Sequence, residues 1–366
     1  MSKWKTVRLG DVLIQQDKSK IKAGEGIDDG VYPFYTCSNE LTKQINTAQY
    51  KGPALIFGTG GKASVHFCSG SFSTSTDCLV YKTSKEVNLS LVNKYLRKNM
   101  YLLENGFKGA GLKHISREYI ANIEISLPEI LEQNKLDSQF DLIESSITNH
   151  KKMLEKYDTL IKSRFIEMFG DPVTNSKNWN LTKLGDLLES IRYGTSTPPV
   201  FSETGYAFIR ATNIKKGKIV NDDMKYISEE EAKKISKCKL NGNEILIVRS
   251  GVNSGDTCVV TKEYINQYAG YDMILVLGNQ INPIYLNELL NTNYMEKMIK
   301  PLTRRAAQPH LNSEQTQSLP IILPPLSLQN DFATFVQQID KSKFAVQKSL
   351  EKAETLYKSL MQEYFG

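Results

Sequence analysis

The chain has 366 residues, of which 40% are hydrophobic and 23% charged, a composition typical of a globular protein and sufficient for two domains. No apolar run approaches the roughly 18 residues of a transmembrane helix. The first residues, MSKWKTVRLGD, lack the apolar core of a signal peptide, so we expect a cytoplasmic protein. Five cysteines without a CxxC pair argue against a disulfide framework and a zinc site.

The net charge of +6 is distributed unevenly. Residues 1–128 hold 17 Lys and Arg against 11 Asp and Glu, and residues 171–324 hold 18 against 16. Residues 129–170 are net negative, with 6 against 8, and residues 325–366 balance at 5 against 5. The positive excess in the two larger segments is a weak indication of nucleic-acid binding. The other two segments have the balance expected of protein contacts.

The first segment, 1–128, has the pattern of a mixed α/β domain. It starts with WKTVRLGDVL at Trp4, and short β-prone runs follow at 52–59 (GPALIFGT) and 77–82 (DCLVYK). Gly, Asn or Ser bounds each run, which predicts strands. A helical pattern comes next, over about 88–104.

Residues 129–170 predict one long helix. Apolar residues recur at alternating steps of four and three from Leu136 to Ile161, and this 3.5-residue period is that of a coiled-coil seam. Pro128 precedes the helix and Gly170 suits its end. A helix of about 40 residues spans about 60 Å.

The rest of the chain repeats this organisation. WNLTKLGDLL at Trp179 corresponds to the start at Trp4, and strands are predicted at 243–250 and 272–277, with a helical pattern over 283–300. Residues 109–170 align without a gap onto the last 62 residues at an offset of 196, and within 151–170 11 of 20 positions are identical. Chance does not explain such a match, so the chain is a tandem duplication.

The predicted fold class is α+β. Two mixed α/β domains, at 1–128 and 171–324, are each followed by a long helix, at 129–170 and 325–366, and the two helices pair as an antiparallel coiled coil. His150 and Lys343 fall on the seam as polar residues that fix the register. The apolar seam is expected to consist of Leu136, Phe140, Ile143, Ile147, Leu154, Tyr157, Ile161, Phe332, Val336, Ile339, Val346, Leu350 and Tyr357.

Along its whole length the sequence resembles the specificity subunits of type I restriction–modification systems. The two openings resemble the start of that family's target-recognition domains, and GVYPFYT (30–36) and GYAFIRATNI (205–214) resemble the next strand segment. KGPALIFGTGGKASV (51–65) and LNGNEILIVRSGVNSG (240–255) resemble the turn after a buried strand. HISREYIANIEISLP (114–128) and HLNSEQTQSLPIILPP (310–325) resemble the closing elements. One departure is Leu328, where the family has the glutamate seen at Glu132.

This resemblance implies a function without catalysis. Each recognition domain is expected to read one half of a split double-stranded DNA target, and the paired helices to set the spacer and bind two methyltransferase subunits. Restriction–translocase subunits complete the assembly. No cofactor or metal is expected in this chain, with S-adenosylmethionine, ATP and Mg on the partner subunits.

The candidate DNA contacts are basic and polar residues on divergent loops, because Arg and Lys suit guanine and phosphate while Asn and Gln suit adenine. GTGGK at 58–62 lacks the spacing of a phosphate-binding P-loop and is interpreted as a turn that faces DNA. The alternative for each candidate is a surface residue that does not contact DNA. The candidates are Lys62, Ser73, Thr74, Lys108, Lys113, Arg210, Asn213, Arg249, Asn253, Arg304, Arg305 and Gln308.

Two other functions stay open from the sequence. One is a single-chain methyltransferase or nuclease. NPIY at 282–285 lacks the second proline of a methyltransferase loop and predicts a helix start, and Glu231 lies in a charged, exposed helical run unlike a nuclease site. The other is a coiled-coil scaffold that binds no DNA. Incubating the chain with DNA and labelled S-adenosylmethionine tests for the enzyme. Gel shifts with DNA fragments, with and without the partner, test for the scaffold that binds no DNA.

Overall fold

The computed structural model describes residues 4–83, 85–303 and 310–366. The chain divides into two compact units: residues 1–151 with 348–366 form the first unit, and residues 152–347 form the second. Each unit therefore combines one mixed α/β domain with parts of both long helices, α5 (Ile130–Phe169) and α10 (Leu326–Phe365). No helix in the described part of the chain has the length and apolarity needed to cross a membrane.

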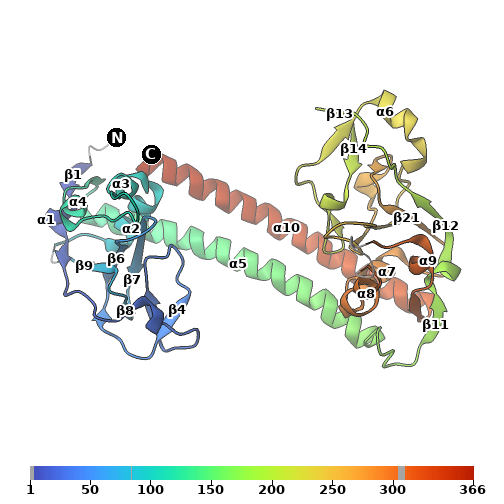
Figure 1. The fold of residues 1–366 in the computed structure, drawn as a ribbon, viewed down its shortest axis with the longest axis horizontal. Coiled ribbons are helices and arrows are strands. Elements are labelled where there is room, and N and C mark those ends of the chain that lie inside the picture. Colours follow the sequence, from blue (N-terminus) through green and yellow to red (C-terminus); the bar gives the residue numbers. More distant parts are fainter. Residues whose placement is uncertain (1–3, 84, 304–309) are drawn as a thin grey trace. The chain divides into compact units, whose positions relative to one another are not determined.

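The domain of the first unit is built on two four-stranded sheets, with orders β2-β9-β6-β7 and β4-β3-β8-β5, and a β1-β10 pair (Figure 1). The predicted strands at 52–59 and 77–82 are confirmed as β6 and β9, and the helical pattern over 88–104 as α2 and α3. The elements in chain order are β1 (Lys5–Arg8), α1 (Leu9–Val12), β2 (Ile14–Gln15), η1 (Ala23–Glu25), β3 (Tyr32–Tyr35), β4 (Lys43–Ile45), β5 (Tyr50–Lys51), β6 (Ala54–Gly58), β7 (Ser64–Cys68), β8 (Ser71–Thr74), β9 (Cys78–Lys82), α2 (Leu89–Lys98), α3 (Tyr101–Glu104), α4 (Arg117–Ala121) and β10 (Glu124–Leu127).

The domain of the second unit has the matching sheets β12-β21-β18-β19 and β13-β17-β14-β20, with the β11-β22 and β15-β16 pairs. In both domains one pair of strands is parallel, β3 with β8 and β14 with β20. The elements are β11 (Asn180–Lys183), η2 (Leu184–Leu187), β12 (Leu188–Tyr193), β13 (Phe201–Ser202), β14 (Tyr206–Ile209), η3 (Ala211–Asn213), β15 (Ile214–Lys215), β16 (Lys218–Ile219), β17 (Lys225–Ile227), α6 (Glu229–Lys234), η4 (Ser236–Cys238), β18 (Ile245–Ile247), β19 (Thr257–Val259), η5 (Lys262–Tyr264), β20 (Tyr268–Ala269), β21 (Met273–Leu277), α7 (Pro283–Leu290), η6 (Met295–Ile299), α8 (Lys300–Thr303), α9 (Ser313–Gln317) and β22 (Pro320–Leu323).

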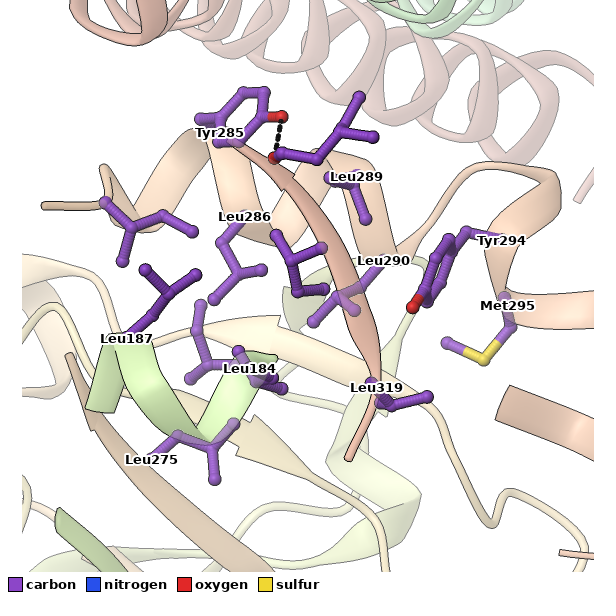
Figure 2. Packing of buried hydrophobic residues seen from close by; sticks show 14 of the residues in the cluster. Leu184, Leu187, Leu275, Tyr285, Leu286, Leu289, Leu290, Tyr294, Met295 and Leu319 are labelled. Carbon is purple, nitrogen blue, oxygen red and sulfur yellow. Dashed lines mark hydrogen bonds between the residues drawn. The ribbon is translucent and has the colours of Figure 1, made fainter. Parts of the chain in front are cut away.

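An apolar core joins helix α7 to the sheet of the second unit. Leu286, Leu289 and Leu290 of α7 point toward the leucines of η2 and toward Leu275 of β21 (Figure 2). Tyr285 is buried in this core, and its hydroxyl donates to the carbonyl oxygen of Ile322 at 2.8 Å, the dashed line of Figure 2. The NPIY segment is thus the start of a buried helix, as predicted.

A duplicated Gln-Asn pair fastens each long helix to its domain. Gln133 Oε1 accepts the backbone N–H of Asn88 at 2.9 Å, and Gln329 Oε1 accepts that of Asn282 at 2.8 Å. Asn88 and Asn282 are in turn the N-caps of α2 and α7. The glutamine makes the bond in both copies, so this bond is kept although Leu328 replaces the glutamate before Gln329.

The two long helices pair antiparallel. In the first unit the ring of Phe140 packs on Tyr357 at 5.7 Å, and in the second unit that of Phe165 packs on Phe332 at 5.5 Å, so a later residue of α5 meets an earlier residue of α10. The predicted α+β fold with an antiparallel helix pair is confirmed. The thirteen expected seam residues are all buried or partly buried. Lys343 on the seam forms an ion pair with Asp158.

Candidate nucleic-acid interface

In the first domain, the turn after β6 is joined by backbone hydrogen bonds to the segment before α4. Gly61 N–H donates to Lys113 O at 3.1 Å, and Lys108 and His114 exchange two bonds of 3.0 Å. We call residues 59–63 and 108–114 the first loop cluster. Lys62, Lys108 and Lys113 are exposed on it and form no ion pair with any described residue. Three cations on joined segments give this cluster a local positive charge.

The second domain carries an equivalent feature on an equivalent strand. The loop after β18 pairs with the segment before α9 through the bridge of Ser250 with His310 and the bond from Leu311 N–H to Arg249 O at 2.8 Å. We call residues 249–256 and 310–311 the second loop cluster. Arg249 opens it, and Asn253 follows, partly exposed and with no side-chain hydrogen bond to a described residue.

Arg249 lies between two aromatic rings. Its guanidinium carbon is 4.4 Å from the ring centroid of Tyr193, at the end of β12, and 4.6 Å from that of Tyr271, just before β21. Below it, the buried carboxylate of Asp272 accepts the backbone N–H of Arg249 at 3.4 Å. Cation–π contacts with two rings restrain the position of the guanidinium.

The comparisons with known proteins identify the family. The profile of the type I restriction modification DNA specificity domain matches residues 1–156 and 176–354. The chain belongs to this family. It is a DNA specificity subunit of a type I restriction–modification system and is not itself catalytic.

Relatives and solved structures agree with this assignment. The specificity subunit is 23% identical to the EcoDI specificity subunit of Escherichia coli, over 99% of this chain and 88% of the relative, and 21% identical to the MjaVIII specificity subunit of Methanocaldococcus jannaschii, over 98% and 91%. Its fold is that of the S subunit from M. genitalium, with a TM-score of 0.74 at 14% identity over 99% of this chain and 96% of that one. A structure on complex assembly and conformational transition of the type I system gives 0.55 at 16% identity, over 100% and 98%.

Three predicted DNA contacts of the specificity subunit are buried. The hydroxyl of Ser73 donates to Thr47 O at 2.6 Å, and Thr74 is fully enclosed beside it on β8. Asn213 is 0% exposed, and its amide donates to the carbonyl oxygens of Val220 and Asp222. None of these three presents a polar group to a ligand, so we remove them from the proposed interface.

Arg210 is occupied in another way. Its guanidinium donates to the carboxylate of Asp223 at 3.0 Å and to the backbone oxygen of the same residue. Its role is to hold the turn that precedes β17, and we remove it from the proposed interface. Arg304, Arg305 and Gln308 lie outside the described residues.

Tyr193 and Tyr271 were missed by sequence reasoning. They come from segments far apart in the chain, and neither tyrosine stands in a motif. Their one signal is a glycine requirement beside them: a Cβ on Gly194 would lie 1.3 Å from the carbonyl oxygen of Gly270, so only glycine lets the two segments meet.

Asp272 gives the second unit a pH-dependent stability. Burial raises the pKa of its carboxyl to about 7, against the lowering effect of the Arg249 N–H and charge. An unfolded aspartate titrates near pH 3.9. Between about pH 4 and 7 the folded state therefore binds the extra proton, and the free energy of unfolding falls as pH rises through this window.

We expect Asp272→Asn to reduce this slope, to which Glu288, whose pKa burial also raises to about 7, contributes the remainder. The variant should also raise the Tm above that of the wild type at about pH 8, where the wild type buries the Asp272 carboxylate. Thermal unfolding at about pH 5 and pH 8 measures it. Asp222→Asn, at an exposed carboxyl, is the control and leaves the slope in place. An unchanged slope in Asp272→Asn contradicts the prediction.

Proposed function

We propose that the specificity subunit reads a bipartite double-stranded DNA target, one half-site per domain, through the first and second loop clusters. The observation that carries this proposal is the equivalence of the clusters. Both follow the matching strands β6 and β18, both are tied to the segment before a short helix, and both present cationic side chains without an ion partner among the described residues. Two equivalent loop clusters, one in each domain, suit a DNA target that consists of two half-sites.

The paired helices are the proposed docking surface for two methyltransferase subunits and the ruler for the spacer. Leu160 of α5 and Leu356 of α10 are equivalent under the 196-residue offset, and both are exposed, at 45% and 50%. Apolar residues repeated on the two helices suit two copies of one partner. S-adenosylmethionine on those partners supplies the methyl group, and restriction–translocase subunits with ATP and Mg join them in the cytoplasm.

Binding to DNA should depend on salt, and the first loop cluster should carry part of this dependence. We expect the double variant Lys62→Ala, Lys113→Ala to lower affinity to a similar extent on all DNA sequences and to reduce the slope of log K against log salt by about two. Titration of the specificity subunit with its methyltransferase, at several salt concentrations, measures both quantities. The partner should also strengthen binding.

The matched control is Lys183→Ala, since this lysine is exposed on β11, away from both clusters in the chain. It should leave the slope within error of the wild type. A double variant with the wild-type slope, or binding that does not vary with salt, would overturn the proposed role of the first loop cluster.

A further inference from the structure

The guanidinium of Arg249 is held by two rings, and its donors have no hydrogen-bond partner among the described residues. Nε is buried and has no partner, and the side chain makes no ion pair or hydrogen bond with any described residue. The neighbouring Arg192 differs, because it donates to Glu244 at 3.2 Å and to the backbone oxygens of Lys237 and Lys239. A held arginine with free donors is prepared for a ligand from outside.

The backbone of Arg249 is also fixed. Its carbonyl oxygen accepts bonds from Leu311 N–H and from the hydroxyl of Ser254, at 2.8 and 2.9 Å. The strand end that carries Tyr193 is held by the bond from Gly194 N–H to Asp272 O at 2.9 Å. The arginine, both rings and the carboxylate thus form a single rigid group.

This group sits at the start of a protruding loop. Three residues after Arg249, Val252 is 100% exposed, and glycines with positive φ, Gly251 and Gly255, flank the loop. The guanidinium, held beside both rings, lies at the base of this loop.

The first domain lacks this group. The position equivalent to Arg249 is Thr59, whose hydroxyl donates to the carbonyl oxygen of Asp77 at 2.8 Å. By the same strand register, Asp77 stands where the second domain has Tyr271. Two domains with the same scaffold that recognise different base sequences must differ in their base-contacting residues, and the Arg249 group is such a difference.

We propose that Arg249 reads a guanine in the half-site of the second domain, with Tyr193 and Tyr271 as positioning residues. The major-groove edge of guanine offers two acceptors, N7 and O6, which match the parallel donors of a guanidinium. Two rings within 4.6 Å of the guanidinium carbon restrain the fork and lower the entropy lost on binding. The inference rests on the proposed function. A phosphate also accepts two bonds from arginine, so the test separates the two ligands.

The test uses the specificity subunit with its methyltransferase, on a duplex with the target mapped from wild-type methylation. Each guanine of the second half-site is replaced in turn by 7-deazaguanine, which lacks N7. We expect one such replacement to weaken wild-type binding about 2- to 10-fold, roughly half the free energy of a bidentate contact, because O6 still accepts one bond. The same replacement should not weaken DNA binding by the Arg249→Ala variant further. This variant should bind equally well whichever base pair stands at that position. The half-site of the first domain stays unchanged.

The tyrosines are tested by the same discrimination. The preference for guanine over 7-deazaguanine should fall in Tyr193→Leu and Tyr271→Leu, which lose the rings. It should stay at the wild-type level in Tyr193→Phe and Tyr271→Phe, which keep them. Arg210→Ala, which removes a guanidinium already paired with Asp223, is the control and keeps the wild-type preference.

The outcomes are distinct. If 7-deazaguanine is without effect at every position and a neutral methylphosphonate weakens the wild type alone, Arg249 binds phosphate and the proposal is overturned. If Arg249→Ala, folded by circular dichroism, keeps all base preferences, it is equally overturned, while sequence-selective binding by the wild type still upholds the proposed function. If the wild type with its partner shows no sequence preference, the proposed function itself fails.

Discussion

Phe365→Ala is expected to destabilise the first unit by about 3–5 kcal/mol, the usual loss for a buried phenylalanine. Phe365 is 4% exposed, and its ring packs at 5.4 Å from that of Tyr95 and 5.5 Å from that of Phe140. Its carbonyl oxygen accepts the amide of Asn99 at 2.9 Å. A residue beside the C-terminus thus closes a core that begins with Trp4.

Chemical denaturation followed by tryptophan fluorescence measures this effect, because Trp4 lies against Phe365 and Tyr364. The unfolding midpoint of the first unit should move to a lower denaturant concentration, and the unfolding midpoint of the second unit should not change. Phe344→Ala, on the same helix but at a side chain that is 73% exposed, is the matched control with an expected change within about 0.5 kcal/mol. Equal midpoints for Phe365→Ala and the wild type would show that the C-terminal turn does not contribute to the core.

The same arrangement occurs in the second unit, where the repeat equivalent of Phe365 is Phe169. Phe169 is fully buried against Tyr285 and Phe332, and its carbonyl oxygen accepts the indole N–H of Trp179 at 2.9 Å. The duplication was visible in the sequence because identical residues recur at a fixed offset. Which domain each helix end completes was not, since that depends on how the two copies pair in space.

The sequence predicted the local elements well and the interface less well. Periodicity located the helices, and β-prone runs bounded by turn residues located β6, β9, β18 and β21, because both signals arise from neighbouring residues. Ser73, Thr74 and Asn213 have the polar side chains of DNA contacts, but the fold buries all three and uses Ser73 and Asn213 to satisfy backbone groups. Residue type alone does not reveal burial.

The arginine group shows the opposite limit. Arg249 was a candidate by type, among others that looked equal, including Arg210. What separates them is a neighbour: Asp223 pairs with the guanidinium of Arg210, while two tyrosines from distant segments hold that of Arg249, which makes no hydrogen bond to a residue that the structure describes. The Tyr193–Arg249–Tyr271 contacts join segments 56 and 22 residues away from Arg249 in the chain, which no local pattern encodes.

Inserting seven residues after Leu154 and seven after Leu350 is expected to lengthen the spacer between the half-sites. Each of α5 and α10 is one uninterrupted helix of 40 residues, and the two sites are equivalent under the repeat. Seven residues add about 10 Å per helix and keep the apolar seam in register. Base pairs rise about 3.4 Å, so the spacer grows by up to about three pairs.

Mapping methylated sites in cells that express the variant system measures the spacer. Three added pairs also rotate one half-site by roughly 100°, given about 10.5 pairs per turn, so we expect methylation of the original target to be lost almost completely. The half-site bases should not change, because both loop clusters are intact. Four-residue insertions at the same places are the control: each is a stutter that locally unwinds the seam, so pairing should weaken and no spacer three pairs longer should result. An active seven-residue variant with the original spacer would show that the helices are not the ruler.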